Sequence, residues 1–165
     1  MTADSNGYVG FGGFRNAPVA IGGTSYIPPT PLNLNSCWGD LIASCQELEE
    51  NPLEQSILLY AEMARNQFFG DGNKRTALLM MNRNLIQNGL CPITITKSRE
   101  VEYRTALIGY YESPEQHRTQ FFDFLKQEQQ TMLKRWDYEI QDVNETELGK
   151  TIDINLKEGS TKHKL

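Results

Sequence analysis

The feature that most limits the fold of this chain is a series of amphipathic segments with a period of 3.6 residues. Pro52 opens the second segment and suits a first helical turn, while Gly89 ends the third, where a left-handed residue often follows a helix. The segments predict an all-α domain of five or six helices around one core. They cover residues 36–51, 52–65, 73–89, 98–113 and 114–138.

The first 36 residues lack this periodicity and are rich in glycine and proline. Two short extended runs, Phe14–Ala20 and Ser25–Ile27, are joined through the Gly22-Gly23 pair. Pro28-Pro29 then end any strand pairing. The pattern predicts a β-hairpin over about residues 13–29 that covers one edge of the helices.

Chain length and pattern together suggest how the domain is organised. A chain of 165 residues is long enough for one domain with its own core. We expect this domain to cover residues 1–138. Residues 139–165 alternate only weakly, and we expect a C-terminal extension that is either a small hairpin or a flexible tail.

Composition narrows the classes of function. No apolar run approaches the roughly 18 residues of a membrane span, and the N-terminus lacks a signal-peptide pattern, so we expect no membrane association. The net charge of −5 argues against a general nucleic-acid binder. Three cysteines without metal-ligand spacing, Cys37, Cys45 and Cys91, are typical of reduced thiols in a cytoplasmic protein.

Residues 70–75, Gly-Asp-Gly-Asn-Lys-Arg, stand where the third helical segment begins. A helix start carries unpaired N–H groups and a partial positive charge. Gly70 and Gly72 would let an anion approach the backbone, and Asn73 would cap the helix or bond a phosphate oxygen.

The charged residues of this turn fit the same idea. Lys74 and Arg75 place two cations where the helix dipole disfavours them, which makes sense if an anion binds there. Asp71 would hold a Mg²⁺ ion that bridges phosphates. From spacing alone, a capped helix whose Lys and Arg side chains are solvated remains an equal alternative.

Two segments carry a resemblance to a known family. The signature of the Fic family, in the Fic/Doc superfamily, reads His-Pro-Phe-x-Asp/Glu-Gly-Asn-Gly/Lys-Arg, and six residues here match it in register: Phe69, Asp71, Gly72, Asn73, Lys74 and Arg75. Upstream, "GFRNAPVAIGGTSYIPP" at residues 13–29 resembles the family's flap, a hairpin that leans over the active site. The resemblance covers roughly residues 8–128.

The resemblance implies a Fic-type helical bundle that transfers AMP from ATP to a Ser, Thr or Tyr hydroxyl of a target protein. By position, Asp71 would bind Mg²⁺ and Arg75 the β- or γ-phosphate. The anion hole would be formed by Gly72, Asn73 and Lys74. The flap residues Pro18, Val19, Ala20 and Ile21 would clamp a segment of the target by adding a strand to it.

The catalytic His of the family is replaced by Gln67 here. A Gln amide orients a hydroxyl but does not take its proton, so we expect the transfer activity to be weakened or lost. Three explanations stay open: natural divergence, engineered inactivation of a toxic enzyme, or a slow natural enzyme. Natural divergence is favoured because Phe68 also departs from the pattern, where the family has Pro. A second Arg of the strongest AMP transferases falls at Leu78, an apolar position that we assign to the core.

Two other functions remain as alternatives. One is a non-catalytic module that binds a nucleotide or an extended peptide. The other is a Doc-like phosphotransferase, or kinase, because Lys74 in place of Gly makes the motif more similar to the Doc branch of the superfamily. An antitoxin or a second copy of the chain stays open as a partner.

Overall fold

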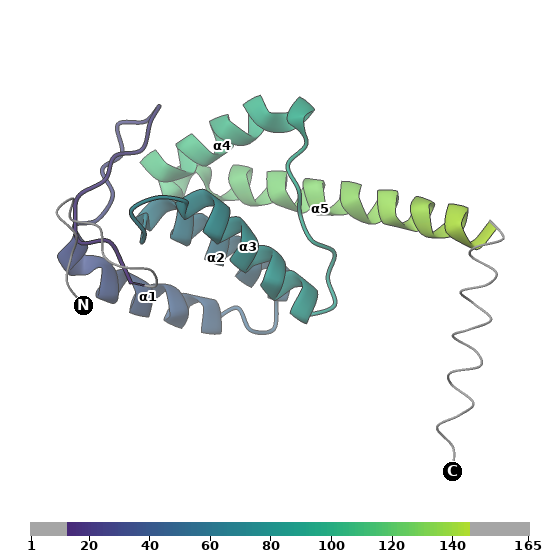
Figure 1. Cartoon of the computed structure of the whole chain (residues 1–165), viewed down its shortest axis with the longest axis horizontal. Helices are drawn as coiled ribbons and strands as arrows, with labels where there is room; N and C mark the ends of the chain where they lie inside the picture. Colours follow the sequence, from purple (N-terminus) through teal and green to yellow (C-terminus); the bar gives the residue numbers. More distant parts are fainter. Residues whose placement is uncertain (1–12, 146–165) are drawn as a thin grey trace, which may run out of the picture. The chain divides into compact units, whose positions relative to one another are not determined.

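The computed structural model describes residues 13–145, and within them the elements are helical. Short 3-10 turns at Pro31–Asn33 and Lys97–Arg99 precede α1 and α4. This agrees with the all-α prediction (Figure 1). The helices are α1 (Leu34–Gln46), α2 (Pro52–Asn66), α3 (Asn73–Gln87), α4 (Glu100–Glu112) and α5 (Pro114–Glu145).

Helix α2 is the central element, in contact with α1, α3 and α4. Its start is fixed locally: the Asn51 side chain accepts a hydrogen bond from the backbone N–H of Glu54 at 3.3 Å, and Pro52 occupies the first turn. Small side chains on α2 and α3, namely Ala61, Ala64 and Ala77, are fully buried and allow the two backbones to lie close together.

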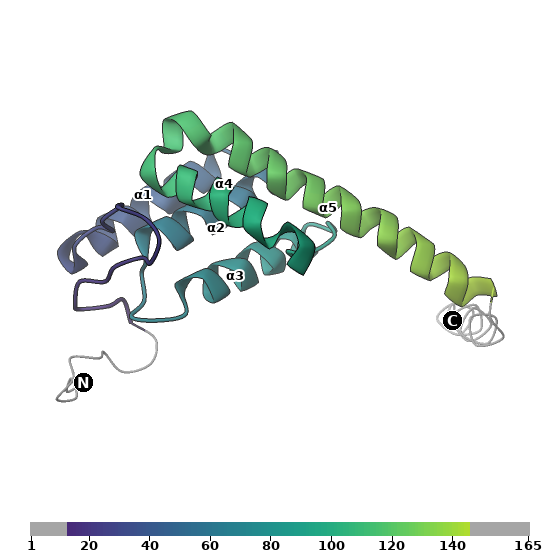
Figure 2. The same ribbon diagram turned by 90° about the horizontal axis from the view of Figure 1, so that it is seen from above.

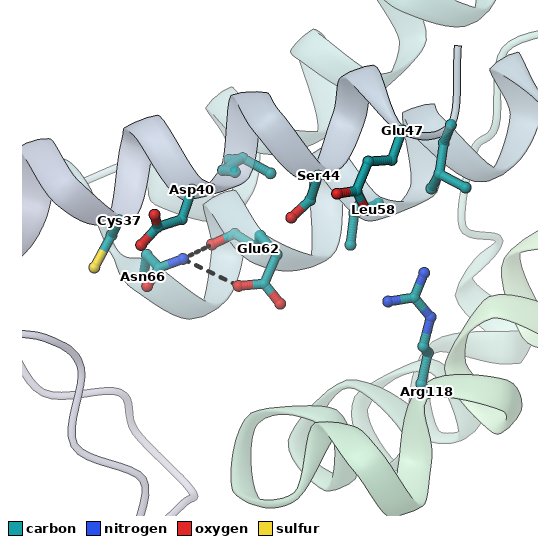
Figure 3. A pocket seen from close by; sticks show the side chains of 10 residues that line it. Cys37, Asp40, Ser44, Glu47, Leu58, Glu62, Asn66 and Arg118 are labelled. Carbon is teal, nitrogen blue, oxygen red and sulfur yellow. Dashed lines mark hydrogen bonds between the residues drawn. The ribbon is translucent and has the colours of Figure 1, made fainter. Parts of the chain in front are cut away.

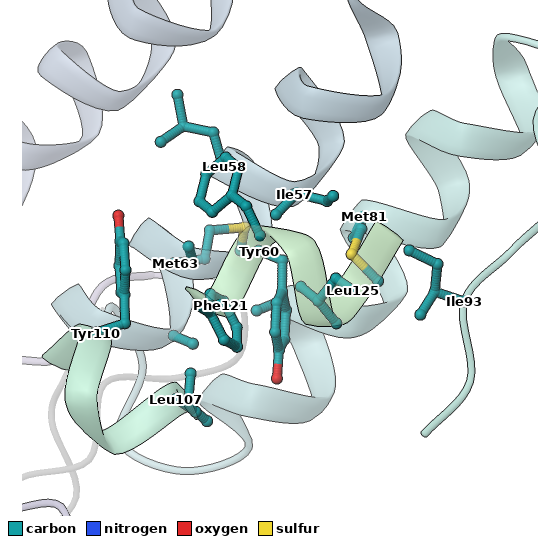
Figure 4. Close-up of a cluster of buried hydrophobic side chains, with 14 of the residues drawn as sticks. Ile57, Leu58, Tyr60, Met63, Met81, Ile93, Leu107, Tyr110, Phe121 and Leu125 are labelled. Atoms are coloured by element: carbon teal, nitrogen blue, oxygen red, sulfur yellow. The ribbon is translucent and has the colours of Figure 1, made fainter. Parts of the chain in front are cut away.

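Rings and aliphatic side chains from each of the helices α1 to α5 and the segment after α3 form the core, part of which is shown in Figure 4. Tyr60 of α2 stacks on Phe121 of α5 with ring centroids 5.9 Å apart, and Tyr110 of α4 lies 5.5 Å from the same ring. Met81 of α3 and Ile93 are fully buried. Burial of these groups is the main favourable term in folding, and it fixes the position of α3.

The connection from α3 to α4 is held by an asparagine. Asn82 donates from Nδ2 to the Ile93 carbonyl at 2.9 Å and accepts the Ile93 N–H at Oδ1 at 2.8 Å. Helix α3 ends as predicted, with Gly89 in a left-handed conformation (φ 71°) and the Leu90 N–H bonded to the Leu85 carbonyl at 2.8 Å.

The chain divides into two compact units, residues 1–129 and 130–165. The described part of the second unit is the remainder of α5, which ends at Glu145. Helix α5 thus runs past the predicted domain boundary at residue 138. The rest of the predicted extension, residues 146–165, lies outside the described residues, and the boundary stays a prediction.

The predicted β-hairpin at residues 13–29 is not seen: this segment reverses direction at Gly22-Gly23 without forming strands. In Figure 2 it turns back on itself next to the loop that leads into α3. The physical reason is that Pro18, Pro28 and Pro29 have no N–H to donate. The side chain of Arg15 joins the two arms in place of a strand ladder. We keep the name flap for residues 13–29.

None of the helices described within residues 13–145 combines the length and apolar character that crossing a membrane requires.

Candidate functional site

The end of α2 places Gln67 at the site in an unusual conformation. It is the one non-glycine residue with positive φ among those described (φ 51°, ψ 60°). Its side chain is only 9% exposed and donates to the Ala64 carbonyl at 2.6 Å. This left-handed residue ends the helix and directs Phe68 into the core, where it is fully buried.

Asn73 closes the loop that follows. Its Oδ1 accepts the Phe69 N–H at 2.8 Å, and its Nδ2 donates to the Phe69 carbonyl at 2.7 Å. Both polar ends of this buried side chain are thus occupied by the backbone of the loop. In this structure Asn73 shapes the site from within, and its predicted contact with phosphate stays a prediction.

Gly72 is the N-terminal cap of α3 and requires glycine for its left-handed backbone (φ 75°). The first backbone hydrogen bond of α3 runs from the Thr76 N–H to the Gly72 carbonyl at 2.9 Å. The amides of Asn73, Lys74 and Arg75 come before it and have no acceptor inside the helix. The backbone therefore offers three donors at the positive end of the helix dipole.

The charged side chains of the motif are exposed. Arg75 Nη2 lies 3.2 Å from Asp71 Oδ2, and both side chains are largely in solvent. An exposed pair of this kind contributes little to stability, so both groups are free to turn toward a ligand. Lys74, also exposed, adds the second cation.

The flap and the motif loop line one cavity of about 400 Å³. The flap contributes Val19, Ala20, Ile21 and Gly22, and the opposite wall is formed by Gln67 and residues 70–75. The structure therefore brings the predicted site residues together, with one exception. Pro18 is exposed and does not line the cavity.

The cavity suits a polyphosphate bound with a divalent ion. Its lining includes two cations, one carboxylate and the three residues whose amides have no acceptor inside α3, which together suit an anion of several charges. Among the described residues, no three His, Cys, Asp or Glu side chains gather to hold a metal ion. A single carboxylate such as Asp71 is nonetheless a typical Mg²⁺ ligand when phosphates supply the others. The residues present thus fit ATP·Mg²⁺.

Leu78, one turn beyond Arg75 on α3, packs against the core as expected. The cation that many family members carry at this position therefore has no substitute on this part of α3. Only Lys74 and Arg75 provide positive charge among the residues that line the cavity.

A second cavity, of about 370 Å³, lies between α1, α2 and the first turns of α5 (Figure 3). Its carboxylates Asp40, Glu47 and Glu62 outnumber its single guanidinium, Arg118. This excess of negative charge opposes a polyphosphate. Burial, and then Asp40, raise the pKa of the Cys37 thiol at its edge, which disfavours the nucleophilic thiolate.

Reasoning from the sequence assigned no role to Arg15, although the structure places it under the site. Arg15 is 6% exposed, and burial lowers the pKa of its guanidinium. A signal was present in the sequence: Arg15 is the one charged residue between Asp4 and Asp40. A lone charge in a glycine- and proline-rich segment indicates a specific partner.

Aromatic rings anchor the base of the flap. Phe14 lies 5.0 Å from the ring of Phe68 and 6.0 Å from that of Trp38, between centroids. Trp38 in turn meets Phe68 edge to face at 5.4 Å. The residue that stands where the family has Pro thus serves as the centre of an aromatic cluster beneath the cavity.

Comparison with known proteins gives two findings. A sequence model described as the Fic/DOC family matches residues 2–85, just over half of the chain. Proteins named protein adenylyltransferase Fic are similar over most of the chain: that of Drosophila grimshawi is 28% identical over 155 residues, and that of Aedes aegypti 26% over 148 residues. Each alignment covers 88% of this chain, but the chain spans only about a quarter of those relatives' length.

Proposed function

The chain belongs to the Fic/DOC family, as its motif and flap predicted, and from this premise we propose that it is an ATP-binding protein adenylyltransferase of lowered activity. The observation that carries the proposal is that the flap and the motif loop, far apart in sequence, line one cavity at the start of α3. The name of these relatives indicates the reaction, transfer of an adenylyl group to a protein.

Each group of residues at the site has a separate role in the proposed reaction. The amides of residues 73–75 and the side chains of Lys74 and Arg75 hold the phosphates of ATP. Mg²⁺, held by Asp71 and phosphate oxygens, would neutralise charge that develops on the phosphates. Residues 19–22 lie across the cavity and hold a segment of the target protein along the flap.

In the proposed reaction a Ser, Thr or Tyr hydroxyl oxygen of the target bonds to the α-phosphorus, the bond to the β-phosphate breaks, and pyrophosphate leaves. The hydroxyl proton needs an acceptor. Gln67 does not accept it, and its amide is engaged with the Ala64 carbonyl. Loss of a general base lowers rates by about 10² to 10⁴, while binding and charge stabilisation remain. The proton then passes to water.

The decisive experiment compares the wild type with Gln67→His, using ATP labelled at the α- or the γ-phosphate and a cell lysate as the source of targets. His tolerates the left-handed backbone of position 67 better than most residues. We expect α-label transfer to rise by about 10² to 10⁴. If Gln67→His transfers no label although ATP binds, the enzyme assignment is wrong and the chain is a nucleotide-binding module. Transfer of γ-label would identify a kinase instead.

A pair of variants on α3 tests the nucleotide site separately. Arg75→Gln removes a cation that lines the cavity, whereas Arg83→Gln removes another exposed cation of α3 that does not. We expect the first to weaken ATP binding by at least tenfold and the second to leave it unchanged, as calorimetry would measure. Equal effects would mean that ATP binds elsewhere.

The proposal also covers the location of the protein and its partners. Cys37, Cys45 and Cys91 are present as thiols rather than disulfides, which fits a cytoplasmic location. An antitoxin or a second copy of the chain remains open as a regulatory partner.

A further inference from the structure

Arg15 contacts four backbone carbonyls that belong to three separate segments. The backbone N–H of Arg15 donates to the Phe68 carbonyl at 2.8 Å, and its side-chain Nε donates to the Gln67 carbonyl at 2.5 Å. Nη1 donates to the Ala17 carbonyl at 3.0 Å, and Nη2 donates to the Pro29 carbonyl. One side chain thus joins the incoming arm of the flap, its outgoing arm and the motif loop.

This arrangement requires an arginine. A guanidinium directs five N–H groups in a planar fork, so that its Nε, Nη1 and Nη2 reach acceptors on different sides at once. A lysine presents its three donors on a single nitrogen and cannot span the same carbonyls. Because no strand ladder joins the arms of the flap, Arg15 supplies the connection that a ladder would otherwise give.

The carbonyl that accepts from Arg15 Nε belongs to Gln67, which stands where the family has its catalytic His. Gln67 is left-handed, and this conformation sets where its carbonyl and its side chain point. The same guanidinium holds both ends of the flap. Any displacement of the flap base therefore pulls on the backbone of residue 67, although Arg15 does not line the cavity.

We propose that Arg15 is a positioning residue that fixes the flap, where a target segment docks, at a set distance from residue 67 and the phosphate site. The role rests on the proposed function, because it presumes that a target lies along the flap. It predicts that Arg15 affects the target side of the reaction and leaves the nucleotide side intact.

The first test uses Arg15→Lys, which keeps the charge and loses the fork. Arg99→Lys is the control, because Arg99 is a less buried arginine that is paired with Glu128 away from the flap. We expect NMR order parameters of residues 19–25 to fall from about 0.85 to below 0.6 in Arg15→Lys alone, with α1–α4 unchanged. A flap as rigid as in the wild type, or a uniform loosening of all helices, would overturn the proposal.

The second test measures function in the Gln67→His background. We expect Arg15→Lys to bind ATP within about twofold of its parent and to lower α-label transfer to lysate proteins at least tenfold at saturating ATP. If Arg15→Lys weakens ATP binding as much as it lowers label transfer, the positioning role is wrong. If the Gln67→His parent transfers no label, the proposed function fails, and the order parameters still decide whether Arg15 fixes the flap.

If Arg15→Lys does not fold, hydrogen exchange in the wild type decides. The backbone N–H and the Nε–H of Arg15 donate to neighbouring carbonyls of the motif loop. We expect both protons to report the same free energy of opening, once each rate is divided by its intrinsic exchange rate, and a lower one than the amides in the middle of α2, as the flap lifts from the loop. Exchange of both only upon global unfolding would make Arg15 a part of the core and overturn the proposal.

Discussion

At the scale of single residues, Asn73 shows how a motif residue can serve the fold and the site together. Asn73→Ala leaves the N–H and the carbonyl of Phe69 without partners, so we expect a loss of about 2 kcal/mol in the free energy of unfolding. Asn73→Asp keeps the acceptor for the Phe69 N–H and should lose less stability, but it places a negative charge beside the phosphates. Urea denaturation and ATP titration of both variants measure the two effects.

The opposite order of the two Asn73 variants would contradict this account. If Asn73→Asp is less stable than Asn73→Ala, or binds ATP more tightly, then Asn73 does not act mainly through the backbone of Phe69. Asn35→Ala, an exposed substitution in α1, is the control and should change neither quantity.

Position 67 provides a second residue-scale prediction. Replacing the left-handed Gln67 by Gly or by Ala removes the same bond to the Ala64 carbonyl, but Ala keeps the backbone strain. We therefore expect Gln67→Gly to be more stable than Gln67→Ala by about 1 kcal/mol. At Thr119, an exposed position inside α5, we expect the opposite: Thr119→Ala should be more stable than Thr119→Gly by about 1 kcal/mol. Thermal unfolding of the four variants compares the two sites.

At the scale of elements, the helices were predictable and the flap was predictable only in part. Periodicity, Pro52 and Gly89 set helix positions because each acts within a few residues. The flap segment was located by its glycines and prolines, but its attachment depends on Arg15, which reaches the distant carbonyls of Gln67 and Phe68. The motif is a local signal, so it predicted which residues gather at the site. The hydrogen bonds that hold Asn73 and Gln67 in place were seen only in the structure.

The outgoing arm of the flap has its own anchor, and it depends on pH. Glu112 at the end of α4 accepts the Thr24 hydroxyl at 2.8 Å and the Ser25 N–H at 3.3 Å. The hydrogen bond from Thr24, followed by that from Ser25, lowers the pKa of this carboxyl. A lowered folded pKa means that the anchor is complete above the ordinary glutamate value of about 4.3 and is lost as the pH falls through the folded value.

We therefore expect the NMR shift of the Ser25 amide proton to titrate with a midpoint below about 4.3. Glu112→Gln should abolish the titration, and Glu115→Gln, a neighbouring exposed carboxylate, should leave it unchanged. A midpoint at or above the ordinary value would show that the contact with Glu112 does not hold the flap in solution.

At the scale of the compact unit formed by residues 13–129, the site depends on how closely α2 and α3 approach. Ala61 and Ala77 are fully buried between packed helices, so a larger side chain must move a backbone. We expect Ala61→Leu to lower the free energy of unfolding by about 1–3 kcal/mol, whereas Ala43→Leu, at an exposed position in α1, should change it little.

The same variant tests whether the site and the core form one cooperative unit. The cavity wall begins where α2 ends and continues into α3, so a shift of α3 against α2 should weaken ATP binding as well as stability. Near-UV circular dichroism follows aromatic packing and far-UV follows the helices, and in Ala61→Leu their unfolding midpoints should coincide. Separate midpoints, or ATP affinity unchanged by a clear loss of stability, would mean that the motif loop keeps its shape independently of the α2–α3 contact.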